Sequence, residues 1–457
     1  MTKLSLHFKI LIIISAFFIS SKKIHSQWII AGDLTGVAGP RPQVSVVDEN
    51  TAFVTGGETT NATYKTTNGG TTWIQLNTGA FKTFWSIWAK DANTVFAGDN
   101  GGGGVGSNGV EKIYKTTNGG FNWILIDSTA GENTAIRGIK FSISNPSFGI
   151  AVGEANNGEF TIYKTRNGGN TWTKDLLTGY PGVHITYSSL NVVDSLFYAF
   201  GTGLTPPAII ITSDGGATWN LRNLNLPSGS GPFTRGIAFK DDKLTGISES
   251  FSLPIIARTT NGGVNWTNID VGNGVTSGVG SIMRWIEGTN TCYLTSSDPG
   301  AGVLKSINGG LNWTQMTTSN TGFFNFDTKK IGSNIYGYAN SSLGNFGGDL
   351  VLKMTDFISG INQISELVPY EYRLSQNYPN PFNPVTNLEF GISKLGFVSL
   401  KIYDMLGKEV ATLVNTNLNP GTYKYNYDAS GLSSGIYFYK LTVDGNIIDT
   451  KRMMLLK

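Results

Sequence analysis

The chain of 457 residues contains one cysteine and three histidines. A disulfide needs two cysteines, so Cys292 cannot form one within the chain, and its strand-like surroundings favour a small buried apolar residue. His7 and His25 fall in the N-terminal segment described next, which leaves His184 alone in the remainder. A lone histidine argues against a multi-histidine metal site and against a catalytic histidine pair. We therefore expect no metal and no cofactor.

Long apolar runs are also missing. The longest candidate, Ile10–Ile19, has ten residues and is too short to span a bilayer. Lys3 and Lys9 precede it, and Ser26 offers a small residue before a cleavage point, so residues 1–26 have the pattern of a secretory signal peptide. An uncleaved membrane anchor is the alternative. With cleavage, no transmembrane segment is predicted in the mature chain.

The chain has no excess of either charge once this segment is removed. Residues 1–26 contain four of the 34 Lys and Arg residues and none of the 31 Asp and Glu residues. The remainder therefore carries 30 basic and 31 acidic residues. No basic stripe stands out, which argues against binding to nucleic acid.

A ten-residue turn sequence recurs six times, and its final tryptophans lie 47 to 50 residues apart. A fixed period of this length, with short alternating strands between the copies, predicts a β-propeller with one four-stranded blade per repeat. The copies are Tyr64–Trp73, Tyr114–Trp123, Tyr163–Trp172, Ile210–Trp219, Ala257–Trp266 and Leu304–Trp313.

Each copy places an Asn or Asp before a pair of glycines and ends on Trp. The Asn or Asp side chain can accept hydrogen bonds from backbone N–H groups of the turn, and the glycines allow positive φ. The tryptophan is suited to packing between neighbouring blades. We expect structural roles for Asn68, Trp73, Asn118, Trp123, Asn167, Trp172, Asp214, Trp219, Asn261, Trp266, Asn308 and Trp313.

One copy fits a known pattern fully, with Thr212, Asp214, Gly216, Thr218 and Trp219 in the order Ser/Thr-x-Asp-x-Gly-x-Thr-Trp. It resembles the Asp-box, or bacterial neuraminidase repeat, and the other five copies carry Asn for Asp. The resemblance implies that the turn holds a hairpin and is not itself the site. Residues 28–358 are most similar to the photosystem II assembly-factor family of plants and cyanobacteria. Members of that family bind a protein through an arginine-rich patch.

The two ends of the repeat region complement each other. Trp28 lies 45 residues before Trp73, and Leu352–Asp356 follows Leu304–Asn308 by 48 residues as a seventh turn without a glycine pair or tryptophan. We therefore predict an all-β protein with a seven-bladed propeller over residues 27–358. Its N-terminal strand would be the outermost strand of the last blade and would close the ring, which removes open sheet edges.

The pattern changes after the repeats. Residues 359–370 are predicted to be a linker, and 371–457 contain short alternating strands with frequent turn signals, which predicts an Ig-like β-sandwich. This region resembles the type A C-terminal sorting domain of the type IX secretion system of Bacteroidetes and related phyla. The residues that carry the likeness are Asn377–Pro384, Val398–Asp404 with Gly407, Ser434–Lys440 and Lys451–Lys457.

This resemblance implies export through the periplasm, with the type IX machinery as a partner of the C-terminal domain. The mature protein would be released or anchored at the outer-membrane surface. An accessory sandwich without a sorting role is the alternative.

The up-and-down strand order places every repeated turn on one face of the ring, and the starts of first strands and the ends of second strands on the other. Concave axial mouths favour ligand sites, so charged and aromatic residues at these positions are candidate ligand-binding residues. The alternative is local pairing of Arg137 with Glu154 and Arg235 with Glu249. The candidates are Arg41, Trp85, Arg137, His184, Arg235, Arg284, Glu58, Asp99, Glu154 and Glu249.

Three functions remain open: a non-catalytic propeller that binds a protein or glycan, a glycoside hydrolase, and a structural element of a cell-surface or gliding apparatus. A sialidase needs a Phe/Tyr-Arg-Ile-Pro signature, which Arg41-Pro42 lacks. A triad of Arg137, Arg235 and Arg284 is available, but its phase in the repeat suggests scaffold. Glycosidases need paired carboxylates, and the acids above sit in no recognisable motif. We predict no catalytic residues.

Overall fold

The computed structural model describes residues 29–34, 43–55, 63–76, 84–99, 110–129, 135–154, 159–180, 189–231, 233–250, 254–272, 279–296, 302–316, 322–331, 334–342, 350–357, 361–365, 367–429 and 431–457. All regular elements within these ranges are β-strands, as the alternating sequence predicts. No helix that could cross a membrane is present in the described part of the chain.

Strands β1 to β28 form seven four-stranded antiparallel sheets in the described ranges, numbered here as sheets 1 to 7. Sheet 1 contains β2 (Val44–Val46), β3 (Ala52–Thr55), β4 (Thr63–Thr66) and β5 (Ile74–Leu76). Sheet 2 contains β6 (Phe84–Ala89), β7 (Val95–Asp99), β8 (Glu111–Thr116) and β9 (Ile124–Thr129). Sheet 3 contains β10 (Ile136–Phe141), β11 (Gly149–Glu154), β12 (Phe160–Thr165) and β13 (Thr173–Leu177).

The later sheets follow the same order. Sheet 4 contains β14 (Asn191–Val192), β15 (Tyr198–Gly201), β16 (Ala208–Thr212) and β17 (Asn220–Asn223). Sheet 5 contains β18 (Thr234–Phe239), β19 (Gly246–Ser250), β20 (Ile255–Thr259) and β21 (Thr267–Asp270). Sheet 6 contains β22 (Val279–Trp285), β23 (Cys292–Ser296), β24 (Val303–Ser306) and β25 (Thr314–Gln315).

Sheet 7 is built from both ends of the repeat region. It contains β26 (Gly322–Ile331), β27 (Asn334–Ser342), β28 (Leu350–Phe357) and, outermost, β1 (Ile29–Asp33). Ile29 pairs with Lys353 and Ile30 with Leu352. The predicted pairing of the N-terminal strand with the last repeat is thus present, while Trp28 lies outside the described residues.

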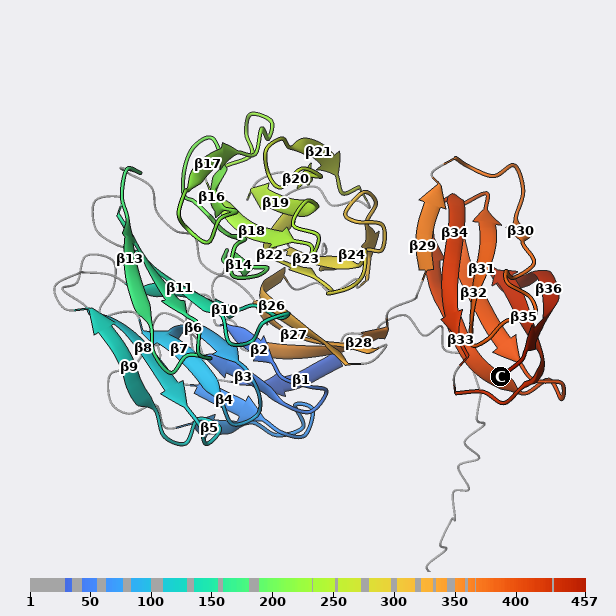
Figure 1. The fold of residues 1–457 in the computed structure, drawn as a ribbon, viewed down its shortest axis with the longest axis horizontal. Coiled ribbons are helices and arrows are strands. Elements are labelled where there is room, and N and C mark those ends of the chain that lie inside the picture. The colour runs from blue at the N-terminus through green and yellow to red at the C-terminus, as the bar shows by residue number, and fades with distance from the viewer. Residues whose placement is uncertain are drawn as a thin grey trace, which may run out of the picture.

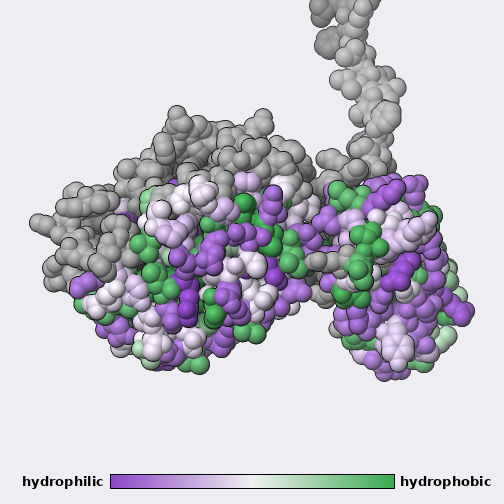
Figure 2. Space-filling view, turned by 90° about the horizontal axis from the view of Figure 1, so that it is seen from above, coloured by the Kyte–Doolittle hydropathy of each residue, from purple (hydrophilic) through white to green (hydrophobic). Residues whose placement is uncertain are grey.

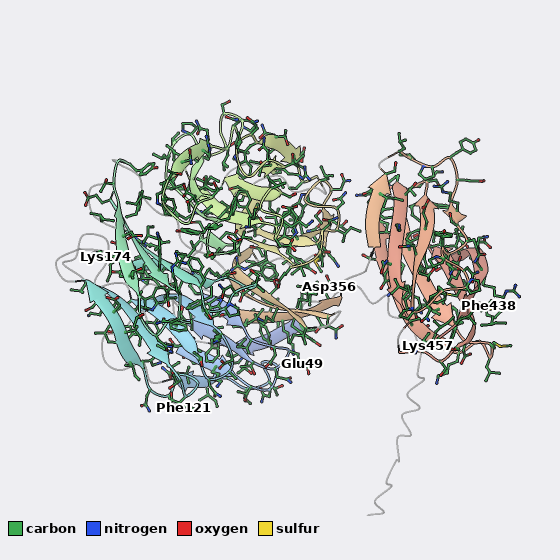
Figure 3. All side chains as sticks on the ribbon, in the orientation of Figure 1. Glu49, Phe121, Lys174, Asp356, Phe438 and Lys457 are labelled. Atoms are coloured by element: carbon green, nitrogen blue, oxygen red, sulfur yellow. The ribbon has the colours of Figure 1, made fainter. Side chains whose placement is uncertain are left out.

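The seven first strands lie at the centre of the ring and the fourth strands at its periphery (Figure 1). Each first strand contacts the next in order, and β26 contacts β2, so the ring is closed. Phe121 and Lys174 lie on the outer edge (Figure 3).

The repeated turns share one hydrogen-bond pattern, seen in sheet 1. Thr66 Oγ1 donates to Asn68 Oδ1 at 3.1 Å and accepts from Gly70 N at 2.8 Å, while Asn68 Oδ1 accepts from Thr72 N at 2.9 Å. Gly70 has φ of 89°, and a Cβ there would lie 2.5 Å from Ala31 Cβ. Both the left-handed conformation and the close approach of β1 therefore require glycine.

The tryptophans of the turns pack between consecutive sheets. Trp266 contributes to a core with Phe239 of its own sheet and with Phe197 and Ile211 of sheet 4. Trp73 of sheet 1 contacts the preceding sheet, sheet 7, across the ring closure, because its Nε1 donates to Ala31 O of β1 at 2.9 Å.

Basic residues of the third strands add polar bonds between sheets. Lys65 Nζ donates to Ala92 O, Lys164 Nζ to Gly215 O, and Arg258 Nε to Gly309 O, in each case to the next sheet. The Lys of the repeated Tyr-Lys-Thr sequence thus helps to hold the ring.

The remaining strands form two further four-stranded sheets that share one apolar core (Figure 1). One has the order β29 (Ile361–Ser365), β34 (Gly421–Asp428), β31 (Val385–Ile392), β30 (Arg373–Leu374). The other has the order β33 (Glu409–Leu418), β32 (Gly396–Tyr403), β35 (Gly435–Val443), β36 (Asn446–Leu455).

The predicted linker over residues 359–370 needs a correction, because part of it is strand β29. Ile361 pairs with Tyr425 and Gln363 with Tyr423. Gln363 Oε1 also accepts a hydrogen bond from Asn308 Nδ2 of the sixth turn, at 3.0 Å. The sequence Ile361-Asn-Gln-Ile-Ser is five residues long and does not alternate between apolar and polar residues, so it does not separate a strand from an extended linker.

The described surface in Figure 2 mixes hydrophilic residues with smaller apolar areas on both the ring and the C-terminal part. Exposed apolar residues of the C-terminal part include Tyr378, Met405 and Leu406.

Candidate functional site

The structure describes some of the predicted ligand-binding residues and not others. Arg41, Glu58 and His184 lie outside the described residues, as does the side chain of Glu154 at the end of β11. Trp85, Arg137 and Arg235 lie in the first halves of β6, β10 and β18, and Asp99 and Glu249 lie at the ends of β7 and β19.

These residues are mostly buried. The Arg137 guanidinium stacks over the Trp85 ring at 4.0 Å, and both residues are less than a tenth exposed. Burial raises the pKa of Glu249 well above its ordinary value, against the charge of Arg235. Asp99 is 2 % exposed. The charge of Arg235 therefore reaches Glu249, but burial outweighs it.

Arg284 does not lie where the sequence analysis placed it. It was expected at the start of a first strand, but it is the next-to-last residue of β22 and pairs with Tyr293. The register of β22 contains an irregularity between Val279 and Met283. Strand β22 begins five residues before Arg284, so the residue lies near its end.

Arg284 belongs instead to a ring of equivalent positions, one from each first strand. In every sheet, this first-strand residue pairs with a residue of the second strand. That second-strand residue pairs in turn with the third-strand position equivalent to Lys65. We call these positions the axial ring. It consists of Ser45, Trp88, Lys140, Asn191, Ala238, Arg284 and Asp327, and all seven line one pocket.

Three members of the axial ring bond to the backbone of the next sheet. Ser45 Oγ accepts from Ala89 N at 2.9 Å, Asn191 Oδ1 from Phe239 N at 3.2 Å, and Asp327 Oδ2 from Val46 N at 2.9 Å. In each case the donor directly follows the ring position of the neighbouring sheet. These side chains therefore hold adjacent sheets at the same height along the axis.

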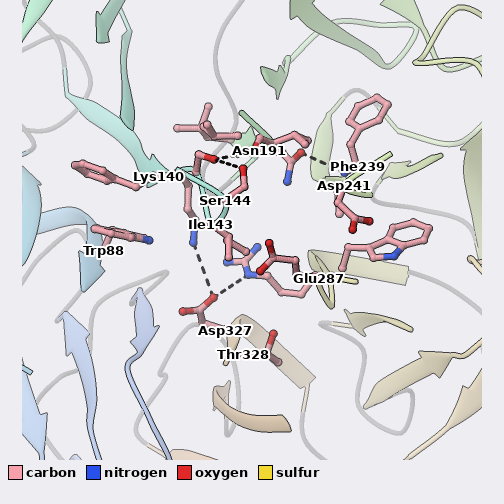
Figure 4. Close-up of a pocket in the computed structure, with 18 of the residues that line it drawn as sticks. Trp88, Lys140, Ile143, Ser144, Asn191, Phe239, Asp241, Glu287, Asp327 and Thr328 are labelled. Carbon is pink, nitrogen blue, oxygen red and sulfur yellow. Dashed lines mark hydrogen bonds and ion pairs between the residues drawn. The ribbon is translucent and has the colours of Figure 1, made fainter. Parts of the chain in front are cut away.

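Asp327 also holds the charged floor of the pocket (Figure 4). Its Oδ1 accepts from Arg284 Nε at 3.0 Å and lies 3.9 Å from Lys140 Nζ. Burial acts to raise the pKa of Asp327, but Lys140 and Arg284 outweigh it and hold the pKa below its ordinary value. One carboxylate thus faces two cations from sheets 3 and 6.

Lys140 is the less well satisfied of the two cations. Burial, reinforced by the charge of Arg284 and opposed by Asp327, lowers the pKa of Lys140 to about 8. Desolvation outweighs the attraction because the carboxylate is shared with Arg284.

A pocket of about 400 Å³ opens above this floor, on the same face as the repeated turns. Its walls include Trp88, which stacks on Phe141 at 4.3 Å between centroids, together with Phe239 and Trp285. Ser144, Asn191 and Thr328 add small polar groups. The size and the mixture of apolar walls with few polar groups are those of a small-ligand site.

Charges of both signs surround the pocket. Five cations and four carboxylates line it among the described residues. Lys243 pairs with Asp194, and Asp241 Oδ2 accepts from Gly288 N at 3.2 Å. Glu287, Lys90 and Lys329 are exposed. The rim therefore carries charges of both signs, whereas cations outnumber carboxylates at the floor.

No group of three or more His, Cys, Asp or Glu side chains that could hold a metal ion lies in the described part of the chain.

This pocket lies at the ends of the strands opposite to those where the sequence predicts ligand-binding residues. A signal did exist, since Lys140, Arg284 and Asp327 are charged residues in three predicted first strands. Whether these three residues occupy equivalent positions depends on strand register, which cannot be read from the spacing of the turns alone.

Comparison with known proteins bears on both parts of the chain. Residues 376–455 match the secretion system C-terminal sorting domain. The sorting domain predicted from sequence is thus found, and it implies export to the cell surface or beyond. No curated protein matches the chain.

The ring is similar in fold to solved β-propeller structures. The structure "YCF48 bound to D1 peptide" matches with a TM-score of 0.51 and 17 % identity, over 72 % of this chain and 94 % of that one. An ancestral GH74 enzyme matches with a TM-score of 0.51 and 14 % identity, over 93 % of this chain and 63 % of that one. The structure "Crystal Structure of Mitotic Checkpoint Complex" matches with a TM-score of 0.51 and 12 % identity, over 78 % of this chain and all of that one. Identities this low describe the fold alone.

Proposed function

We propose that this protein is an exported, non-catalytic binding module of the cell surface or its surroundings. In this proposal the seven sheets are the blades of an Asp-box propeller that presents the ligand site. The C-terminal sheets are an Ig-like sorting domain handled by the type IX machinery. We place the start of that domain at or before Ile361, since β29 pairs within its sheet. Residues 1–26 would direct the chain to the inner membrane and be removed.

The observation that carries the binding role is the axial pocket. It combines a volume of about 400 Å³, aromatic walls and a buried floor of Lys140, Arg284 and Asp327. Pockets with these properties are where ligands bind in most proteins. The opposite mouth, with Trp85, Arg137, Arg235 and Glu249, is the second candidate surface.

The hydrogen bonds that the carboxylates of the pocket accept favour non-catalytic binding. The Asp327 carboxylate accepts from Val46 and Arg284, and the Asp241 carboxylate accepts from Gly288. Glycoside hydrolysis needs one carboxylic acid and one carboxylate that both face the bond to be cleaved. A carboxylate held by a cation and a backbone N–H stays ionised and does not supply a proton.

A glycoside hydrolase of sialidase or xyloglucanase-like type remains the second proposal. Asp241 and Glu287 line the same pocket, and the fold is shared with a GH74 enzyme. Turnover of a glycan that disappears in Glu287→Gln would favour this alternative over the binding module.

A binding and turnover screen tests the proposal. The secreted protein is applied to glycan and peptide panels, and both retention and product release are measured. Ser144→Trp should block the pocket, because Ser144 is exposed and lines it. Ser147→Trp is the matched control, since Ser147 is exposed in the same loop but does not line the pocket.

We expect the parent and Ser147→Trp to retain a ligand that Ser144→Trp does not retain. This ligand should be released chemically unchanged. Retention that Ser144→Trp leaves intact would move the site elsewhere. Product release at a steady rate would replace the binding module with an enzyme.

Export is tested by removing residues 361–457. The truncated chain should accumulate in the periplasm, because the sorting domain is what the outer-membrane step recognises. Surface display of the truncated chain would contradict this role.

A further inference from the structure

We propose that the floor of the axial pocket binds the carboxylate of an acidic sugar, a uronic acid, between Lys140 and Arg284. This inference rests on the proposed binding function and names the chemical class of its ligand.

The first argument is the supply of hydrogen-bond donors at the floor. Lys140 Nζ lies 3.9 Å from Asp327 Oδ1, too far for a hydrogen bond, and it makes none with the described residues. An ammonium carries three donors. Arg284 uses Nε on Asp327 and Nη1 on Met283 O, while its Nη2 makes no hydrogen bond within the described part of the chain. Both cations therefore present donors to the pocket.

The second argument is the charge balance. Lys140 and Arg284 share the single carboxylate of Asp327, whose other oxygen accepts from Val46 N. A partly buried cation without a full set of partners loses part of its hydration without full compensation. A second carboxylate would give each cation its own anion and would form charge-assisted hydrogen bonds, which are the stronger kind.

The third argument concerns the part of the ligand above the carboxylate. Asn191 accepts from Phe239 N through Oδ1, while its Nδ2 makes no hydrogen bond among the described residues. Ser144 and Thr328 add hydroxyl groups, and Trp88 and Trp285 supply flat apolar faces. A ring with several hydroxyl groups and one carboxylate matches this combination.

The rim argues against an acidic peptide. Asp241 and Glu287 line the pocket above the floor, next to Lys90 and Lys329. A polyanion would meet these carboxylates, whereas a neutral sugar body with one carboxylate at its deep end would not. The charge pattern therefore favours an acidic sugar at the end of a glycan over a run of Asp or Glu residues.

The test uses the mature full-length protein and isothermal titration at pH 7 with methyl glucuronide, methyl glucoside and a tri-glutamate peptide. We expect the glucuronide to bind at least about tenfold more tightly than the glucoside, as for charge-assisted bonds. Lys140→Met should remove this preference. Lys174→Met, which removes one charge from exposed strand β13 and does not touch the pocket, should keep it.

Folding of each variant is checked by its melting temperature, and Ser144→Trp supplies a second variant that leaves the floor unchanged. Loss of glucuronide binding in both Lys140→Met and Ser144→Trp supports the proposal. A glucuronide preference that survives Lys140→Met overturns it. Tighter binding of tri-glutamate than of glucuronide also overturns it.

Equal binding of glucuronide and glucoside, with loss in Ser144→Trp, would overturn the acidic-sugar inference while supporting a binding pocket. Absence of binding by all three probes would overturn the inference, and the wider panels would then decide the binding function separately.

Discussion

The Asp327 carboxylate accepts a hydrogen bond from Val46 N at 2.9 Å, although the two residues are 281 positions apart in the chain. Val46 lies in β2 of sheet 1 and Asp327 in β26 of sheet 7, so this bond crosses the closure of the ring. The same carboxylate holds Arg284 and faces Lys140 at the floor of the pocket. Ring closure and pocket floor therefore depend on one side chain.

Asp327→Asn keeps an acceptor for Val46 but removes the negative charge. We expect a loss of about 2 kcal/mol in the free energy of unfolding, because two partly buried cations lose their counter-charge. Denaturant unfolding measures it. Lys140→Met in the same background should restore part of the loss, and an unchanged unfolding midpoint in Asp327→Asn would contradict the assignment.

The lowered pKa of Lys140 predicts a pH dependence. Between about 8 and its ordinary value of 10.5, Lys140 is neutral in the folded chain and protonated in the unfolded one, so the unfolded chain binds more protons. The free energy of unfolding should therefore rise with pH in this window, relative to Lys140→Met. Glucuronide binding should weaken over the same window, because the ammonium is lost.

The charged groups that face Lys140 at the floor are Arg284 and Asp327. The lowered pKa of Asp327 acts in the same direction but in the acid range, because its contribution to the free energy of unfolding is present above the ordinary Asp range and is lost as pH falls through the lowered value. It does not overlap the alkaline window. Equal pH profiles of parent and Lys140→Met would rule out the assignment. The other charged residues lining the pocket are Lys90, Asp194, Asp241, Lys243, Glu287 and Lys329.

The hydrogen bonds of the repeated turn predict that two substitutions of Asn68 differ in their effect on stability. Asn68→Ala removes the acceptor of Thr72 N and should cost about 1 kcal/mol. Asn68→Asp keeps the acceptor and introduces the residue type found at the equivalent position of the fourth turn, Asp214. There the carboxylate accepts from Thr218 N at 2.9 Å. Thermal unfolding of both variants tests this, and equal losses in the two would show that the side-chain acceptor does not matter.

Ring closure predicts that deletion of residues 27–34 destabilises the protein and causes aggregation. The deletion removes β1 and the acceptor Ala31 O of Trp73 Nε1, and it leaves β28 as an unpaired edge. The control is an equal deletion within residues 101–109, which the sequence predicts to be a loop and which lie outside the described residues. A melting temperature of the N-terminal deletion equal to the parent's would contradict the closure.

The turn pattern predicted the strands and sheet pairing well because it acts locally. Asn68 and Thr66 fix their own hairpin, and Trp73 marks its outer strand. The site was harder to predict, because Lys140, Arg284 and Asp327 meet only after ring closure and after local irregularities such as that of β22. Strand β29 was mistaken for a linker because its partner, β34, lies more than fifty residues later.

A crystal structure of the full-length mature protein soaked with glucuronate tests the central claim most directly, because it shows where the carboxylate lies. The account predicts the carboxylate within hydrogen-bond distance of Lys140 Nζ and Arg284 Nη2, with the sugar ring between the pocket walls. Glucuronate bound at the opposite mouth beside Arg137 or Arg235, or a pocket left without it, would contradict the account.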